Sequence, residues 1–186
     1  KLMGGVDINQ DESKDIVDAW RSAYPEITKG WQTCHGALHT ILKGATGAAV
    51  DPWGMVYPIP EGLQTPKGII RYPDLRQEED EETGRYEFIY GQGRNKARIY
   101  AGKIVENIVQ HLARCVIADN ALEVQRVSRL IPALMVHDEL VYVVPEAEAE
   151  STLDLVQGVM RTPPVWWPEL LTWSEGDIAD TYGDAK

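Results

Sequence analysis

Two short apolar runs enclose three consecutive ionisable side chains in the stretch "LMVHDELVYVV", residues 134–144. Aliphatic and β-branched residues dominate both runs, and His137, Asp138 and Glu139 lie between them. This pattern predicts a β-hairpin, in which two short strands are joined by a tight polar turn. Such a turn holds the three ionisable side chains at the exposed lip of a sheet.

The carboxylates of Asp138 and Glu139 suit a hard metal ion at that turn. Mg²⁺ prefers oxygen ligands and keeps positions open for water and phosphate oxygens. In phosphoryl and nucleotidyl transfer, two such ions lie about 4 Å apart and hold the attacking and leaving oxygens. One aspartate cannot hold two ions, so this interpretation requires a second carboxylate from elsewhere in the fold. A solvated hairpin turn that carries acids without a metal is the alternative.

The composition fits one domain, or one and a half, with a true hydrophobic core, because 44% of the 186 residues are hydrophobic. No apolar run approaches the roughly 20 residues that span a bilayer, so we expect no membrane segment. Cys34 and Cys115 lie far apart without the spacing of metal ligands. This is typical of reduced thiols in an intracellular protein.

Charge is distributed unevenly along the chain. The formal net charge of −11 argues against nucleic acid as a partner, because DNA is a polyanion. Residues 84–103, however, carry five cationic side chains and one acid, a local charge of +4. Residues 145–186 carry two cations and nine acids, a local charge of −7. The basic segment can bind a phosphate backbone, or it can be a solvated loop.

Hydrophobic periodicity predicts a mixed α+β chain in three parts. The first part is helical, the second is rich in strands and turns, and the third combines helices with the hairpin. Their bounds are residues 1–47, 48–101 and 102–186.

Caps and breakers mark the expected helices. Asn9 or Asp11 can cap a helix that starts near Glu12, and Pro25 separates this helix from a second one. Further helices are expected over residues 103–122 and 147–160, and a charged hairpin tip or loop over residues 78–84.

The helix over residues 103–122 carries a polar stripe opposite its apolar face. Asn107, Gln110 and Arg114 recur along it at helical spacing. Amide side chains can contact base edges in the minor groove, where every base pair offers acceptors, so these contacts depend little on sequence. Arg114 can reach a phosphate or a base edge. An ordinary solvent-facing side of a helix is the alternative.

Five segments carry a resemblance that covers nearly the whole chain. They are "VDAWRSAYPEITKGW" (17–31), "TPKGIIRYPDL" (65–75), "KIVENIVQHLAR" (103–114), "VHDEL" (136–140) and the ending "YGDAK" (182–186). Together they resemble the C-terminal segment of a family A DNA polymerase, of the DNA polymerase I superfamily, in its phage-type branch. In that order they resemble the helical segment after the fingers helix, an insertion of the branch, the helix that contacts the primer–template minor groove, palm motif C and the branch's C-terminus.

The resemblance implies a fold and a catalytic site. It implies a palm-type antiparallel sheet with the motif C hairpin and packed helices, plus helices from the base of the fingers. The three parts then correspond to the helical part of the fingers, the strand-rich insertion and the palm. Asp138 is implied to be a catalytic Mg²⁺ ligand, Glu139 a nearby and less essential catalytic carboxylate, and His137 a contact to the primer terminus.

The same resemblance implies a set of DNA-binding residues. Gln110 is implied to contact the minor groove at the growing end of the primer. Glu106 stands where many relatives have an asparagine, so the second amide role passes to Asn107. Arg114, Lys103 and Arg98 complete the expected set.

The implied reaction is template-directed DNA synthesis, in which the primer 3′-hydroxyl attacks the α-phosphate of a dNTP with two Mg²⁺ or Mn²⁺ ions. The aspartate of motif A and the lysine and tyrosine of the fingers helix have no match in this sequence, which opens with "KLMGG" where the fingers helix would have just ended. We therefore expect a C-terminal polymerase part that is inactive alone. Its partners would be primer–template DNA, dNTPs and an upstream polymerase segment, in the cytoplasm of a phage-infected bacterium.

Other interpretations remain open at this point. The main alternative is a non-catalytic, palm-like nucleic-acid-binding module that acts through a partner, and a metal-dependent nuclease is a weaker one. His35 and His39 have the spacing of a zinc-binding pair but no further ligand, so we expect ordinary helix-face histidines. We expect the tryptophans of the tail to anchor it by packing rather than to form a partner surface.

Overall fold

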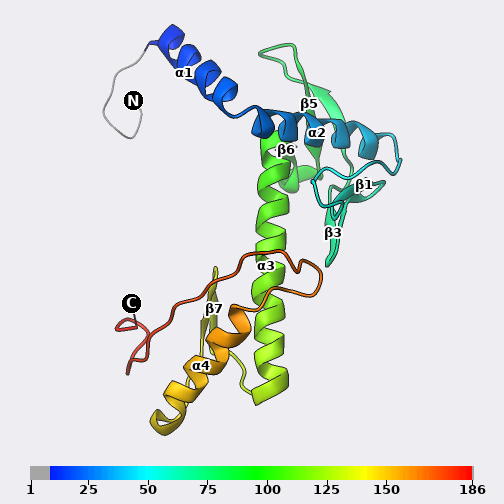
Figure 1. Ribbon diagram of the computed structural model, residues 1–186. Coiled ribbons are helices and arrows are strands. Elements are labelled where there is room, and N and C mark those ends of the chain that lie inside the picture. Colours follow the sequence, from blue (N-terminus) through cyan, green and yellow to red (C-terminus); the bar gives the residue numbers. More distant parts are fainter. Residues whose placement is uncertain (1–8, 186) are drawn as a thin grey trace. The chain divides into compact units, whose positions relative to one another are not determined.

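Helices and small antiparallel sheets alternate along the chain in the computed structural model, which describes residues 9–185 (Figure 1). Four α-helices and three sheets are present in that range, so the predicted α+β class is confirmed. The chain forms two compact units, Lys1–Asn107 and Ile108–Lys186, and a long helix, α3 (Ala101–Ser128), runs from the first into the second. The opening "KLMGG" segment lies outside the described residues.

The first helix, α1 (Gln10–Ala23), starts two residues before the predicted Glu12 because Asn9 is its cap. The Asn9 side chain accepts from the Glu12 backbone N–H, and the Glu12 carboxylate accepts from the Asn9 N–H, both at 2.9 Å. This reciprocal pair is a capping box. None of the residues of α1 is fully buried, and Trp20 stacks on Trp31 of the next helix with ring centroids 5.7 Å apart.

Pro25 is the first residue of the second helix, α2 (Pro25–Leu42), rather than a break within one helix. The first turn of a helix tolerates proline because its missing N–H would have no partner there. Four side chains of α2 are buried at helical spacing, namely Cys34, Ala37, Leu38 and Ile41. Burial raises the pKa of the Cys34 thiol, and both Cys34 and Cys115 are free, as predicted.

The first sheet follows α2 and contains β1 (Tyr57–Ile59), β2 (Gly62–Thr65) and β3 (Gly68–Arg71) in that order, all antiparallel. A Cβ at Gly62 would lie 2.0 Å from the backbone oxygen of Ile70, so only glycine fits where these two strands approach. The loop before β1 is organised by Asp51, whose carboxylate accepts backbone N–H groups of Trp53, Met55 and Val56.

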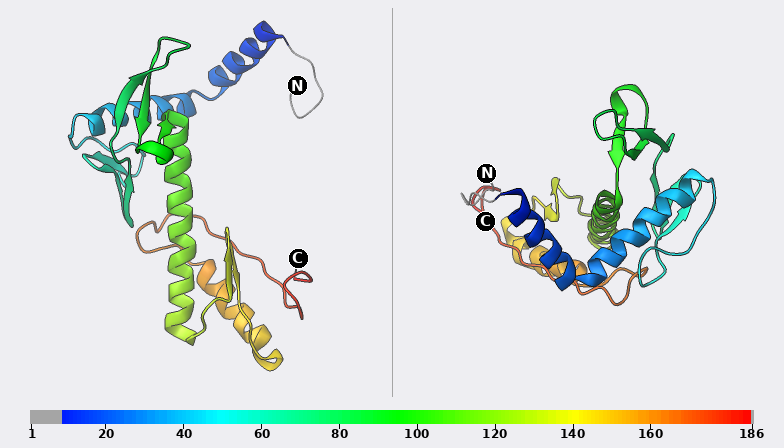
Figure 2. Two further views of the ribbon diagram at one scale, coloured as in Figure 1. Left: turned by 180° about the vertical axis from the view of Figure 1, so that it is seen from behind. Right: turned by 90° about the horizontal axis from the view of Figure 1, so that it is seen from above.

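The second sheet contains β4 (Arg76–Glu79), β5 (Tyr86–Tyr90) and β6 (Ala97–Ile99), also antiparallel. Residues 80–85 form the expected charged hairpin tip, although its first acids lie in β4. Phe88 of β5 packs against α2, because the rings of His35 and His39 lie edge-on to it at centroid distances of 5.6 and 4.9 Å. Figure 2 shows the backbone of α2 and of this sheet from two further directions.

The opposite face of this sheet carries paired charges. Glu78 of β4 and Glu87 of β5 are directly opposite each other. Two like charges in these positions would destabilise the strand pair without cations beside them. Lys96 and Arg76 contact Glu78, and Arg98 contacts Glu87. Hydrogen bonds from Lys96, which has the largest effect, and from Arg76 lower the pKa of Glu78.

In the second unit, α3 continues to Ser128, six residues beyond the predicted end, and buries Leu112, Ile117, Ala121 and Val124. Two short strands follow it, β7 (Leu134–Val136) and β8 (Glu139–Val141), and form a separate two-stranded sheet. A short 3₁₀ turn leads into α4 (Ala149–Met160). In the described part of the chain, no helix combines the length and apolar character that crossing a membrane requires.

Residues 161–185, after α4, contain no helix or strand and are held by side chains. Trp166 donates its indole N–H to the Asp119 carboxylate at 2.8 Å, so it anchors the segment through a hydrogen bond, whereas packing was predicted. The Arg161 guanidinium donates to the Ser174 carbonyl and lies 4.4 Å from the Trp173 ring centroid. Trp173 itself is 73% exposed, so it is attached through this contact rather than by burial.

Candidate active site

The His-Asp-Glu stretch forms a hairpin, as the sequence predicts. Val136 of β7 and Glu139 of β8 are directly opposite each other, so the turn between the strands contains only His137 and Asp138. Glu139 is therefore the first residue of β8 and not part of the turn. All three ionisable side chains are exposed. The hairpin thus presents two carboxylates and an imidazole in consecutive positions.

His137 has a left-handed backbone conformation, with a φ of 51°. Two-residue hairpin turns require a positive φ at their first position, and glycine, asparagine and aspartate normally supply it. For any other residue the left-handed region costs roughly 1 kcal/mol or more. Residues with a strained backbone concentrate at functional sites, where a particular side chain is retained despite the conformational strain.

His137→Gly is therefore expected to raise the free energy of unfolding by about 0.5 kcal/mol, because glycine adopts a positive φ without steric strain. If the imidazole contacts a primer, the same variant loses DNA synthesis in an assembled polymerase. Urea denaturation and primer extension measure the two effects. Arg129→Gly is a matched control, because Arg129 also has a positive φ, 66°, but lies outside the hairpin. Extension that falls equally in both variants would contradict a specific role for His137.

Glu139 is held by a tyrosine from the C-terminal segment. The Tyr182 hydroxyl donates to Glu139 Oε2 at 2.6 Å, across 43 residues of sequence. The hydrogen bond to Glu139, together with desolvation, raises the pKa of the Tyr182 hydroxyl. This contact fixes one carboxylate oxygen of Glu139 and ties the end of the chain to the hairpin. The local pattern around Tyr182 gave no indication of it.

Tyr142, just after β8, has a hydroxyl oxygen that is buried and has no hydrogen-bond partner among residues 9–185. Burial raises the pKa of this hydroxyl. A buried polar group without a partner costs about 1–3 kcal/mol. The Tyr142 hydroxyl, next to the hairpin, therefore lacks a hydrogen-bond partner among residues 9–185.

The donor set at the hairpin suits a divalent cation only as part of a larger site. Across the described range, no group of three histidine, cysteine, aspartate or glutamate side chains is arranged to hold a metal ion. Asp138 and Glu139 supply oxygen ligands from adjacent positions. Mg²⁺ is commonly held by one or two protein carboxylates and keeps several waters and substrate oxygens, so these residues fit that ion as partial ligands.

Two of the predicted DNA-binding residues lie on α3 in the same unit as the hairpin. Gln110 and Arg114 are exposed and one turn apart on the helix. The third member of the stripe differs, because Asn107 is half-buried in the first unit, where its amide donates to the Tyr72 hydroxyl at 3.2 Å. Asn107 must release Tyr72 before it can contact a base.

The remaining two predicted DNA-binding residues already have internal partners. Lys103 donates to Glu106 Oε1 at 2.7 Å, and this hydrogen bond raises the pKa of the lysine. Arg98 forms an ion pair with Glu87 at 2.7 Å. Both side chains of the Lys103–Glu106 pair are exposed, so this pair contributes little stability and is easily exchanged for a phosphate. In the second pair Arg98 is exposed, but Glu87 is largely buried, with its side chain 19% exposed.

Comparison with curated proteins finds a DNA polymerase of Bacillus phage SP02 that is 29% identical over 191 aligned positions. The alignment covers 97% of this chain and 29% of the phage protein, so the chain spans less than a third of that relative's length. No family model matches the chain, and no solved structure matches it. The likeness supports distant homology to one part of a phage DNA polymerase.

Proposed function

We propose that this chain is the C-terminal part of a template-directed DNA polymerase of family A, in its phage-type branch. The observation that carries the proposal is the hairpin with Asp138 in a two-residue turn, in a chain that aligns over 97% of its length with part of a phage DNA polymerase. In this proposal α1 and α2 belong to the base of the fingers, residues 48–101 are the branch's insertion, and residues 102–186 belong to the palm.

Each residue of the hairpin then has a chemical task. Asp138, which is exposed and held in a two-residue turn, offers carboxylate oxygens to a divalent cation. Bound Mg²⁺ would lower the pKa of the primer 3′-hydroxyl and neutralise charge on the phosphates. Glu139, held by Tyr182, adds negative charge beside Asp138. His137 positions the primer terminus from the first residue of the turn.

The DNA is proposed to lie along the polar stripe of α3. Gln110 contacts base edges in the minor groove, where an amide can pair with acceptors common to all base pairs. Arg114 contacts a phosphate or base edge. Asn107, Lys103 and Arg98 join them by exchanging their internal partners for DNA groups. Binding of these cations to the phosphates of a duplex would release counterions from the DNA, and this release makes the exchange favourable.

The proposed site is incomplete without an upstream polymerase segment. Two-metal nucleotidyl transfer needs carboxylates on both ions, and the motif A aspartate has no counterpart in this sequence. The dNTP-gripping lysine and tyrosine of the fingers helix also have none. We therefore propose that activity requires a polypeptide that supplies these three side chains.

Primer extension tests the proposal directly. The 186-residue chain is incubated with a primer–template, four dNTPs and Mg²⁺, first alone and then with an upstream segment that carries motif A and the fingers helix. We expect extension only from the combined polypeptides. Extension by the chain alone would show a second metal carboxylate within it and contradict the split site. No extension from either, with DNA binding intact, would favour the non-catalytic binding module.

A further inference from the structure

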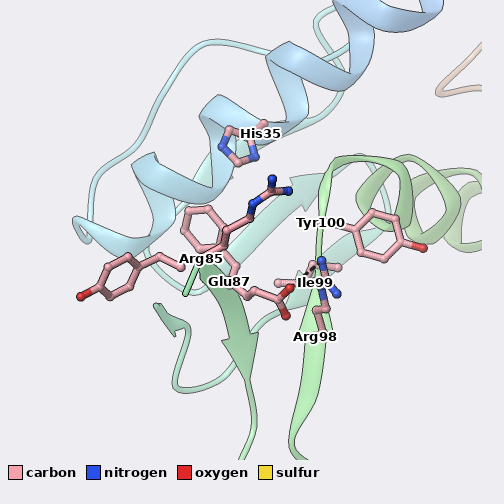
Figure 3. Close-up of a pocket in the computed structure, with 8 residues that line it drawn as sticks. His35, Arg85, Glu87, Arg98, Ile99 and Tyr100 are labelled. Carbon is pink, nitrogen blue, oxygen red and sulfur yellow. Dashed lines mark ion pairs between the residues drawn. The ribbon is translucent and has the colours of Figure 1, made fainter. Parts of the chain in front are cut away.

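A pocket opens in the first unit between α2 and the sheet of β4, β5 and β6, with a volume of about 160 Å³ (Figure 3). Its floor is apolar, because Phe88 and Ile99 are directly opposite each other on β5 and β6 and are 4% and 2% exposed. The antiparallel pairing places the start of β5 beside the end of β6. The polar rim therefore combines His35 of α2 with Arg85, Tyr86, Glu87, Arg98 and Tyr100.

The rim contains a cation that has no side-chain partner among residues 9–185. Arg85 is exposed, extends toward His35 in Figure 3, and forms no ion pair or side-chain hydrogen bond with any described residue. Arg98 is held by Glu87 and lies 5.9 Å from the Tyr100 ring centroid. The Arg85 guanidinium is therefore available to an anionic ligand at this pocket, although the chain as a whole carries a net charge of −11.

Two aromatic side chains that line the same pocket are exposed to water. Tyr86 is 68% exposed and Tyr100 is 54% exposed. Proteins that bind single-stranded nucleic acid combine cations that follow the phosphates with aromatic faces on which unpaired bases stack. The pocket offers the same combination of a cation and aromatic rings. Its apolar floor favours a flat aromatic ring over a small inorganic anion, which would have to give up its hydration shell there.

We propose that this pocket binds single-stranded DNA, with a phosphate on Arg85 and an unpaired base against Tyr86. Arg98 of β6 and Tyr100, just after β6, also line this pocket. A duplex is excluded from this mode because its bases are stacked on each other and not available to the tyrosines. The proposal rests on the proposed function, since the single strand in that reaction is the template beyond the primer end.

Fluorescence anisotropy with a labelled oligodeoxynucleotide of about 12 nucleotides tests the pocket on the 186-residue chain. Arg85→Gln is expected to weaken binding several-fold and to reduce the slope of log K against log salt by about 0.7, the value for one phosphate contact on a single strand. Tyr86→Ser is expected to weaken binding by about fivefold or more through lost stacking, with the salt slope unchanged. Circular dichroism confirms that both exposed substitutions leave the fold intact.

Arg71→Gln and Tyr57→Ser are matched controls, because both residues lie on the first sheet of the same unit and are at least partly exposed. They are expected to bind DNA as the unchanged chain does. The proposal is overturned if the chain does not bind the oligonucleotide, if the Arg85 and Tyr86 variants bind as tightly as the controls, or if a blunt duplex competes equally through the same two residues. A separate experiment tests the proposed function without the pocket. Primer extension by the assembled polypeptides is measured on a template whose single-stranded overhang is one nucleotide long, so that synthesis there does not need the pocket.

Discussion

Under the proposed function, Asp138→Ala is expected to reduce DNA synthesis by the combined polypeptides by at least about a hundredfold, because losing one proposed metal-binding carboxylate would remove charge stabilisation at the reacting phosphate. The side chain is exposed and lies in a two-residue turn, so its loss leaves the hairpin strands paired. Surface substitutions of this kind change the free energy of unfolding by less than about 0.5 kcal/mol. Single-turnover primer extension in Mg²⁺ measures the rate, and anisotropy with primer–template shows that DNA still binds.

Asp154→Ala is the matched control, since Asp154 is an exposed aspartate of the same unit on α4. It is expected to leave synthesis unchanged. Glu139→Gln is expected to have a smaller effect than Asp138→Ala, because Tyr182 can still donate to the amide oxygen that replaces the carboxylate. An Asp138→Ala variant that keeps synthesis within a few-fold of the control would remove the catalytic hairpin from the proposal and leave the binding module.

Leu38→Ala is expected to lower the free energy of unfolding of the first unit by about 3 kcal/mol, the typical cost of a cavity left by a buried leucine. Leu38 is 0% exposed and lies in the middle of the buried face of α2. Such a loss is a large fraction of the about 5–15 kcal/mol that stabilises a domain. Urea denaturation followed by circular dichroism measures it, with the slope of the transition checked because two units can unfold separately.

Leu42→Ala provides the comparison on the same helix. Leu42 is 37% exposed at the last position of α2, so its truncation leaves an open surface rather than a cavity. The expected change is below about 1 kcal/mol. Equal losses from the two variants would show that α2 does not bury Leu38 in solution.

Much of the local structure could be predicted from the sequence because short-range chemistry determines it. Asn9 and Glu12 carry the donor and acceptor groups of a capping box within four residues, and Pro25 can only begin a helix or interrupt it. The hairpin at residues 134–141 followed from two apolar runs with three ionisable residues between them, although Glu139 proved to belong to the second strand. In each case the residues that decide the structure are neighbours in the chain.

The end of α3 was predicted wrongly because its stop residue is unusual. Helices commonly end at a glycine in the left-handed region. Here Arg129 has that conformation. The Ser128 hydroxyl donates to the Val124 carbonyl and also accepts a hydrogen bond from the Leu130 N–H. An arginine gives no helix-stop pattern, so the expected helix ended six residues early.

The contacts that complete the candidate site could not be predicted, because they join residues that are distant in sequence. Nothing near Tyr182 identifies Glu139 as its partner, and nothing near Asn107 identifies Tyr72. Periodicity predicted which side of α3 is polar, but not that the amide of Asn107 is bonded to Tyr72. The pocket on the second sheet was equally hidden, because strand pairing alone brings Arg85 and Tyr100 to one rim.

The order in which the C-terminal segment is attached has a consequence for folding. Trp166 reaches back 47 residues to Asp119, and Tyr182 reaches back 43 residues to Glu139. Residues 161–185 contain no helix or strand that could form before these contacts. Because contacts between distant residues tend to form late, and because a ribosome delivers Tyr182 after the whole hairpin, we expect the hairpin to pair before Tyr182 binds it. We therefore expect the carboxylate of Glu139 to reach its final position late in the folding of the unit.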